Sequence, residues 1–394
     1  MADMHIFEAF DNGEDTQLIE AKLFQLDPLT MQDNYEVDTL LLTQDVVDLN
    51  ERKVFLESVA AYLGKDVSTS ADELLIEVKH RYAEKEIELK KAVKGWFQKQ
   101  DVAPSTDQAY RRNLYDFCVA MGMDYHTTAE FFLKAFLTIP FNYKDRDDAI
   151  YFYCLKESRP HAVIKQMLDV ADSFTVTNVD VDSTEEIGLR ILEIENDEEF
   201  LQYLQKYCYD RKHQYATAKR RLVELITANK AIVPGKDKTG YDLPFDHLGT
   251  AKNSALLEAI LGYRYQGLDS TQRKHMKESG LPTFPRDGDI DDILATESET
   301  SFEVLRRSLI LMKFYNFYRS YQLSTKRLNM DEEDINACLY DFFDETNEEL
   351  ASCGFVQMYL RNPFDWIILF CANSPNPIDY LKDFIQKRYL GNLE

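Results

Sequence analysis

The two halves of this chain share a pattern that limits the folds open to it. The segment 128–154 resembles the segment 346–372, 218 positions later. Each copy predicts a helix, a short loop with a proline and a basic residue, and an apolar helix opened by an aspartate. The matched residues suit packing and capping rather than catalysis, so the pattern indicates a repeated helical module that serves binding or assembly. The identical pairs are Thr128/Thr346, Glu130/Glu348, Asp147/Asp365, Ile150/Ile368 and Phe152/Phe370.

Most of the remaining chain also has helical spacing of its apolar residues. Residues 302–321 are apolar on nearly all sides, which is typical of the central helix of a bundle. Ser70 and Glu73 have the spacing of a capping box, and the helix that they open is predicted to continue to about Lys99. We therefore predict an all-α protein of two related multi-helix bundles with an acidic, poorly structured N-terminal arm.

The expected domain organisation follows changes in composition. Residues 1–50 carry twelve acidic side chains and one lysine, Lys22, which predicts a solvated arm, with docking or mimicry of DNA as the sharper alternative. Residues 173–187 alternate valine with threonine and aspartate; they fit a single strand, but an isolated strand has no partner, so a linker is favoured. The predicted boundaries are 1–48 for the arm, 49–172 for the N-terminal helical domain, 173–195 for the linker and 196–394 for the C-terminal helical domain.

Charge and cysteine usage restrict the class of protein. The net charge of −24 argues against a whole-surface binder of nucleic acid or anionic membranes. The longest strongly apolar run, 366–372, is too short to cross a bilayer, so no membrane partner is expected. The six cysteines lack the short spacings of zinc or redox motifs and are interpreted as buried reduced thiols of a cytoplasmic protein: Cys118, Cys154, Cys208, Cys338, Cys353 and Cys371.

One segment has a weak enzymatic pattern. Glu77 and Lys79 follow the apolar residues 74–76, as in the core of a metal-dependent nuclease, where Asp66 would complete the metal site. That core needs a sheet, whereas a helix would point Glu77 and Lys79 to different sides. We therefore favour a charged helix face and predict a non-enzymatic protein without catalytic residues, metal or cofactor.

Two basic clusters interrupt the acidic background. The first, between residues 90 and 112, has six basic and two acidic side chains and is a candidate DNA-binding segment, because local positive charge neutralises phosphates. The second cluster also contains more basic than acidic side chains. The alternative for both is a solvated face. The candidate DNA-binding residues are Lys90, Lys91, Lys94, Lys99, Arg111 and Arg112, and the second patch contains Arg211, Lys212, Lys219, Arg220 and Arg221.

The first cluster lies in a segment that resembles a known family. Trp96, then Pro104-Ser105, then the run from Arg111 to Met121 and Gly122 resemble the second half of a phage-repressor-type helix-turn-helix domain. The resemblance implies a recognition helix that ends at Trp96, with its N-terminal part in the major groove and a turn before it near residues 84–88. The following module also resembles uncharacterised all-helical proteins of Gram-positive bacteria, which implies a fold and no function.

The sequence leads to two main hypotheses about function. The first is a non-enzymatic regulatory or adaptor protein that binds DNA through residues 90–112, with the second bundle contacting a protein partner or another copy of the chain. The alternative is a protein-interaction scaffold without nucleic acid. The nuclease that uses Glu77 and Lys79 ranks third.

Overall fold

The structure is a computed structural model in which all substantial elements of the described chain are helices. It describes residues 54–99, 102, 108–136, 138, 140–143, 145–174, 184–207, 215–236, 242–243, 251–295, 300–324, 332–353, 355, 357–358 and 362–391. The only strands among them are β1 (Gly235–Lys236) and β2 (Asp242–Leu243), which pair antiparallel. The all-α prediction is confirmed. The predicted N-terminal arm lies outside the described residues.

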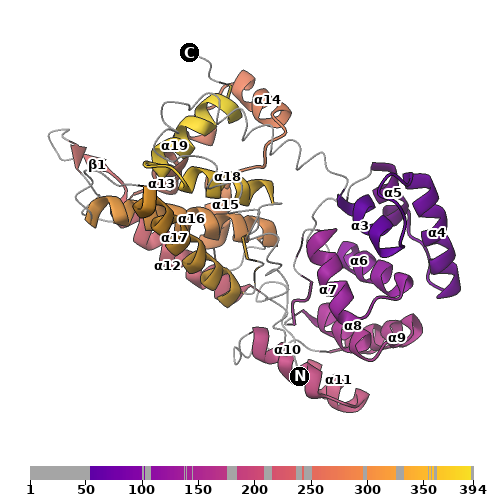
Figure 1. The fold of residues 1–394 in the computed structure, drawn as a ribbon. Coiled ribbons are helices and arrows are strands. Elements are labelled where there is room, and N and C mark those ends of the chain that lie inside the picture. The colour runs from indigo at the N-terminus through magenta and orange to yellow at the C-terminus, as the bar shows by residue number, and fades with distance from the viewer. Residues whose placement is uncertain are drawn as a thin grey trace. The chain divides into compact units, whose positions relative to one another are not determined.

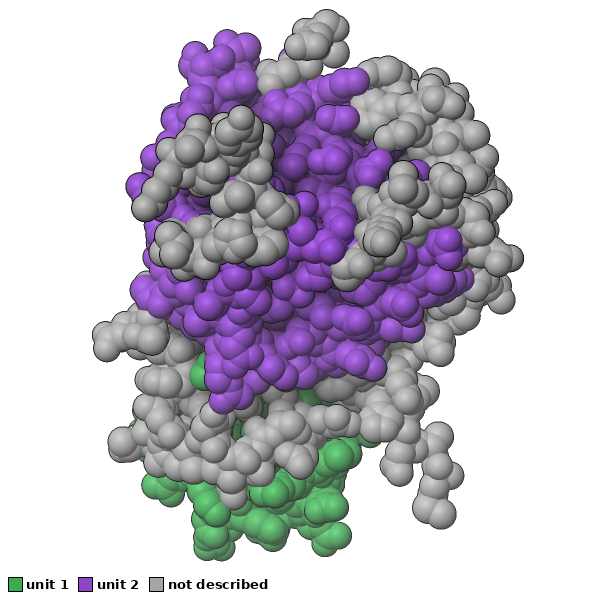
Figure 2. Space-filling view, turned by 90° about the vertical axis from the view of Figure 1, so that its left-hand side faces the viewer, with its two compact units in different colours: residues 1–9, 53–216 green, residues 10–52, 217–394 purple. Residues whose placement is uncertain are grey.

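The chain divides into two compact units, which are coloured separately in Figure 2. The described part of the first unit ends at Ala216, and the second begins at Thr217. Figure 1 labels the helices. Those of the first unit are α3 (Val54–Tyr62), α4 (Ala71–Glu84), α5 (Lys91–Lys99), α6 (Gln108–Met121), α7 (Tyr125–Lys134), α8 (Arg146–Lys156), α9 (His161–Ala171), α10 (Thr184–Glu193) and α11 (Asp197–Tyr207). Those of the second are α12 (Ala216–Ile232), α13 (Asn253–Leu261), the 3₁₀ turn Tyr265–Gly267, α14 (Ser270–Glu278), α15 (Asp287–Leu294), α16 (Phe302–Ser324), α17 (Glu332–Ser352), α18 (Pro363–Ala372) and α19 (Pro377–Phe384), which a π-helical turn, Ile385–Tyr389, continues.

The boundary between the units differs from the predicted one. The predicted linker, 173–195, contains α10, and α11 also belongs to the first unit, so that unit extends about twenty residues beyond the predicted start of the second domain. Ile187, Ile191 and Phe200 are fully buried in the core of the first unit, which accounts for the shift. Residues 175–183, on which the strand alternative depended, lie outside the described residues.

Each unit has one central helix that contacts several others. In the first, α6 contacts α4, α5, α7 and α8. In the second, α16 contacts α15, α17, α18 and α19, and side chains on most of its sides are buried, as the sequence predicts for residues 302–321. The five cysteines of the described chain are buried, namely Cys118, Cys154, Cys338, Cys353 and Cys371. Cys208 lies outside the described residues.

Both units contain a buried ion pair between an arginine of the central helix and an aspartate of the helix after next. In the first unit, Arg111 on α6 donates from Nε to both carboxylate oxygens of Asp148, at 2.9 Å each, and from Nη2 to the backbone oxygen of Pro140 at 3.1 Å. In the second, Arg306 on α16 donates to Asp365 at 2.9 and 2.6 Å, and to the backbone oxygen of Gln357 at 2.9 Å. We call each set an arginine clamp.

The clamps place the internal repeat in a different register from the predicted one. Each aspartate is the third residue after the N-cap of its helix, which is Asp145 for α8 and Asn362 for α18. A shift of 217 positions therefore matches Asp148 with Asp365, and the same shift matches Pro140 with Gln357 and Cys154 with Cys371. The clamps therefore favour a match of Asp365 with Asp148 over the predicted match with Asp147 at a shift of 218. The relatedness of the two units stays an inference, which the repeated clamp supports.

Candidate nucleic-acid interface

The helix predicted from Ser70 to Lys99 is broken into α4 and α5. Its predicted beginning is confirmed, since Ser70 and Glu73 form both hydrogen bonds of a capping box. The break occurs at Glu86, which adopts φ of 55°. Its N–H donates to the backbone oxygen of Ala83 at 3.2 Å, and the N–H of Ile87 donates to that of Tyr82 at 2.9 Å. This is the hydrogen-bond pattern of a Schellman helix end, in which glutamate takes the place usually held by glycine.

Burial explains how the turn forms without glycine. Ile87 and Tyr82 are 6% and 1% exposed, and their positions are those at which an apolar contact accompanies a Schellman end. The left-handed conformation of Glu86 costs about 1 kcal/mol, and burying an isoleucine contributes about 1.5–3 kcal/mol, so the break is favourable. The described chain therefore has two helices, α4 and α5, separated by residues 85–90, where helical periodicity predicted a single helix.

One side of α5 is anchored in the core. Trp96 is 5% exposed and packs edge-on against Phe55 and Phe117, with ring centroids 5.9 and 6.1 Å apart. Val93 and Phe97 are buried on the same side. The opposite side faces away from the core. Its exposed residues are Lys91, Ala92, Lys94, Gln98 and Lys99.

Gly95 lies in the middle of α5 beside these lysines. A Cβ atom added at this position would meet nothing within 4 Å, so no packing within the described chain requires a glycine. Glycine inside a helix costs roughly 0.5–1 kcal/mol relative to alanine. With Ala92, it gives the basic side of α5 a low profile.

The N-terminal end of α5 gathers positive charge around a glutamate. The Nζ of Lys90 lies 2.5 Å from Oε2 of Glu88. The hydrogen bond and charge of Lys90, followed by the charges of Lys165 and Lys94, lower the pKa of the Glu88 carboxyl. Lys165 is an exposed residue of α9, far away in the sequence. We call Lys90, Lys94, Lys165 and Glu88 the Glu88 cluster.

Arg111 and Arg112 do not belong to this surface, contrary to the prediction. Arg111 is the largely buried arginine of the first clamp, where burial disfavours its charge but the charge of Asp148 raises its pKa above the usual value. Arg112 pairs with the buried Asp147 at 2.5 Å. Burial and the charges of Asp148 and Asp147 raise the pKa of Asp145, the N-cap of α8, to about 7. Both arginines therefore have acidic partners within the unit.

The second predicted patch is only partly described. Arg211 and Lys212 lie outside the described residues. On α12, Lys219 is 9% exposed, and Arg220 is exposed. Arg221 pairs with Glu224 at 3.0 Å and with Glu349 of α17 at 3.3 Å. These three side chains do not form one solvent-facing basic surface.

The residues of the nuclease hypothesis lie on a helix. Glu77 and Lys79 are both in α4, and Glu77 lies 3.8 Å from Arg81 one turn later. Asp66 accepts hydrogen bonds from Ser68 in the loop before α4. The sheet that a nuclease core needs is not formed at residues 71–84, so these residues are not brought together as that hypothesis requires.

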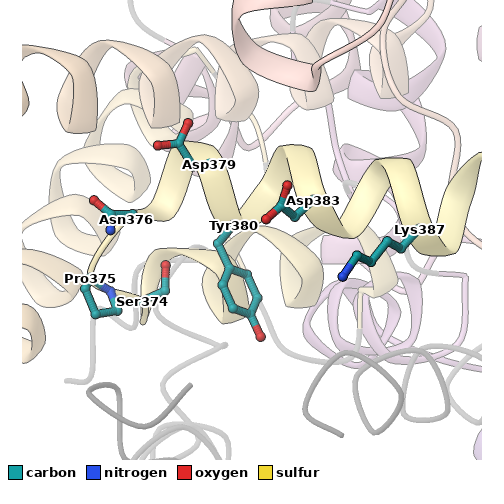
Figure 3. A pocket seen from close by; sticks show the side chains of 7 residues that line it. All are labelled: Ser374, Pro375, Asn376, Asp379, Tyr380, Asp383 and Lys387. Atoms are coloured by element: carbon teal, nitrogen blue, oxygen red, sulfur yellow. The ribbon is translucent and has the colours of Figure 1, made fainter. Parts of the chain in front are cut away.

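The second unit has a polar cavity of about 310 Å³ beside α19. Figure 3 shows Asp379, Asp383 and Lys387 along one side of the helix, with Tyr380 and Ser374 nearby. Lys387 belongs to the π-helical turn, a conformation often found at functional sites. The cavity has the size and polarity to admit a small polar molecule. The two acidic side chains are exposed, and Asp379 already interacts with Lys382 at 3.4 Å.

Two searches of the described residues give negative results. No three or more histidine, cysteine, aspartate or glutamate side chains are grouped so that they could hold a metal ion. None of the described helices combines the length and the apolar character that crossing a bilayer demands.

Sequence reasoning missed three features of this surface. The turn at Glu86 lacks a glycine signal, and only the helix-turn-helix resemblance implied it. Lys165, whose charge affects Glu88, lies 77 residues away in the sequence. Gly95 was visible as a glycine between lysines in a helical pattern, which is the signal that could have identified it.

Comparisons of the chain with protein-family models, with curated proteins and with solved structures each find no match.

Proposed function

We propose that the first unit binds DNA through the exposed side of α5, as part of a non-enzymatic regulatory or adaptor protein. The observation that carries the proposal is a helix anchored by Trp96 on one side, with lysines and two small residues on the other. The lysines neutralise phosphates, and the low profile at Ala92 and Gly95 lets the helix approach the duplex closely. The turn at Glu86 supports an arrangement like that of helix-turn-helix proteins, in which the N-terminal part of the second helix contacts the major groove.

The overall negative charge does not oppose this proposal. The segment 85–99 contains five lysines, Lys85, Lys90, Lys91, Lys94 and Lys99, and two glutamates. Exposed charges more than about 8–10 Å apart are largely screened at physiological salt, so a duplex at α5 is affected mainly by nearby residues. The remaining acidic charge disfavours contact elsewhere and leaves α5 as the preferred surface.

Changing Lys91 and Lys94 to glutamine is expected to weaken binding of a short mixed-sequence DNA duplex by roughly 10- to 100-fold at low salt. Each lost phosphate contact makes the dependence of log K on log salt shallower by about 0.9, so the double variant loses about two units of slope. Fluorescence anisotropy at several salt concentrations measures both quantities. Lys134→Gln, on α7 and also exposed, is the matched control. Equal affinities of wild type, double variant and control would refute the proposal.

Changing Gly95 to alanine separates a DNA surface from a solvated helix. We expect α5 to gain roughly 0.5–1 kcal/mol of stability, because alanine is the better helix former and nothing obstructs its methyl group. DNA affinity is expected to fall, because the methyl group keeps the helix from the duplex. Thermal denaturation and anisotropy measure the two effects. Gly288→Ala in α15, where a Cβ also has open space, is the control with no change in DNA affinity. Unchanged affinity for Gly95→Ala would show that α5 does not make the close approach.

A protein-interaction scaffold without nucleic acid is the second candidate. Val67, in the loop before α4, and Ile76, in α4, are both 65% exposed. They would suit an apolar contact with a protein partner or another copy of the chain. If the protein is such a scaffold, changing the lysines of α5 does not change its affinity for DNA. The salt titration of the lysine variants therefore distinguishes the two candidates.

A further inference from the structure

The Glu88 cluster combines a feature that attracts phosphate with one that repels it. Lys90 is the residue whose backbone oxygen accepts the first hydrogen bond of α5, from the N–H of Lys94 at 3.3 Å. Lys90, Lys91 and Lys94 thus surround the N-terminal end of the helix, where the backbone also favours an anion. An anion is already present there, because the Glu88 carboxylate lies 2.5 Å from the Lys90 ammonium.

The pair has no structural role that the described residues reveal. The side chains of Lys90 and Glu88 are 47% and 78% exposed, and an exposed ion pair contributes little to the stability of a fold. The neighbouring Ile87 is buried and fixes the turn, so the chain does not need Glu88 to hold its position. The Glu88 carboxylate instead pairs with the lysine that would otherwise contact a phosphate.

We propose that the Glu88 cluster is a phosphate-binding site of the DNA surface in which the Glu88 carboxylate competes with the DNA backbone. This inference rests on the proposed function and adds two things to it. Lys90 and Lys94 become contacts to a phosphate at the N-terminal end of α5. Glu88 becomes an internal competitor, which must leave Lys90 before a phosphate binds and which therefore keeps affinity for DNA low.

Changing Glu88 to glutamine tests the competition. The variant is expected to bind a short mixed-sequence duplex severalfold more tightly at low salt, because Lys90 no longer has to leave a carboxylate before it contacts a phosphate. Glu130→Gln on α7 is the matched control, since Glu130 is also exposed and also pairs with one lysine, Lys134, at 3.7 Å. Both variants remove one negative charge from the first unit. An equal gain in affinity from both would mean a general charge effect and would overturn the inference.

Changing Lys165 to glutamine tests the composition of the cluster without DNA. The pKa of the Glu88 carboxyl is expected to rise, measured by an NMR titration of the side-chain carbon, because one of the nearby positive charges is lost. An unchanged pKa would remove Lys165 from the cluster and refute that part of the inference. If Lys165→Gln raises this pKa but no variant changes DNA affinity, the proposed function fails and the competition fails with it. If the α5 lysine variants weaken DNA binding but Glu88→Gln and Glu130→Gln change DNA affinity equally, only the inference fails.

Discussion

Replacing Arg306 with methionine is expected to destabilise the second unit by about 3–5 kcal/mol. Arg306 and Asp365 have side chains 2% and 0% exposed, so the variant leaves a carboxylate buried without its partner. The backbone oxygen of Gln357 loses its donor at the same time. Because the clamp joins α16 to α18, we expect loss of the packing between these helices rather than a local adjustment.

The two tryptophans allow each unit to be followed separately. Trp96 lies in the first unit and Trp366 in the second, and the chain contains no others. In a Trp96→Phe background, the fluorescence of Trp366 during urea unfolding reports the second unit. We expect its midpoint to fall for Arg306→Met, whereas the Trp96 signal, followed in a Trp366→Phe background, stays near the wild-type midpoint.

Two further variants make the clamp prediction specific. Arg264 pairs with Glu258 on the surface of the same unit, with both side chains about half exposed, so Arg264→Met should cost less than about 1 kcal/mol. Combining Arg306→Met with Asp365→Leu removes both charges and should recover much of the loss, since a buried ion pair contributes little more than apolar residues of similar volume. A cost for Arg306→Met no larger than that for Arg264→Met would contradict the account of the clamp.

The helices that the sequence predicted best are those whose ends have local signals. The apolar helix expected in the second copy of the repeat corresponds to α18, because Asn362 caps it and Pro363 fits its first turn. The apolar helix predicted over residues 302–321 corresponds to α16, Phe302–Ser324. Helical periodicity missed the break at Glu86, which only the helix-turn-helix resemblance implied, because the signal for the break is the burial of Ile87, which depends on tertiary packing. A glutamate in the left-handed region cannot be recognised from local propensity.

The candidate site was predictable only as far as helical periodicity extends. Lys91 and Lys94 face away from Val93 and Trp96, as the apolar pattern indicates. Arg111 looked equally available in the sequence, yet its partner Asp148 lies 37 residues away. Lys165 lies 77 residues from Glu88 in the chain, about twice that separation. Contacts of this kind come from packing of helices that are not neighbours in sequence, so spacing alone does not reveal them.

Changing Asp148 to asparagine is expected to destabilise the first unit by about 3–5 kcal/mol, the same range as the loss of Arg306. The variant removes the carboxylate that pairs with the Arg111 guanidinium, which is only 15% exposed. It also weakens the hydrogen bond that the N–H of Asn142 donates to Asp148 at 2.8 Å. Unfolding in urea, followed by Trp96 fluorescence in a Trp366→Phe background, measures the cost.

The matched change Asp147→Asn tests which aspartate corresponds to Asp365. Asp147 is as buried as Asp148, but its partners Arg112 and Arg146 are 34% and 23% exposed. Water can hydrate these two guanidinium groups when the carboxylate is neutralised, so we expect a smaller loss, on the order of 1–2 kcal/mol. If Asp147→Asn instead costs as much as Asp365→Asn while Asp148→Asn is mild, the shift of 218 positions describes the energetics of the repeat better than the shift of 217. The larger cost at Asp148 is the result that the geometry requires, because a guanidinium group shielded from water depends on its carboxylate more than a hydrated one does.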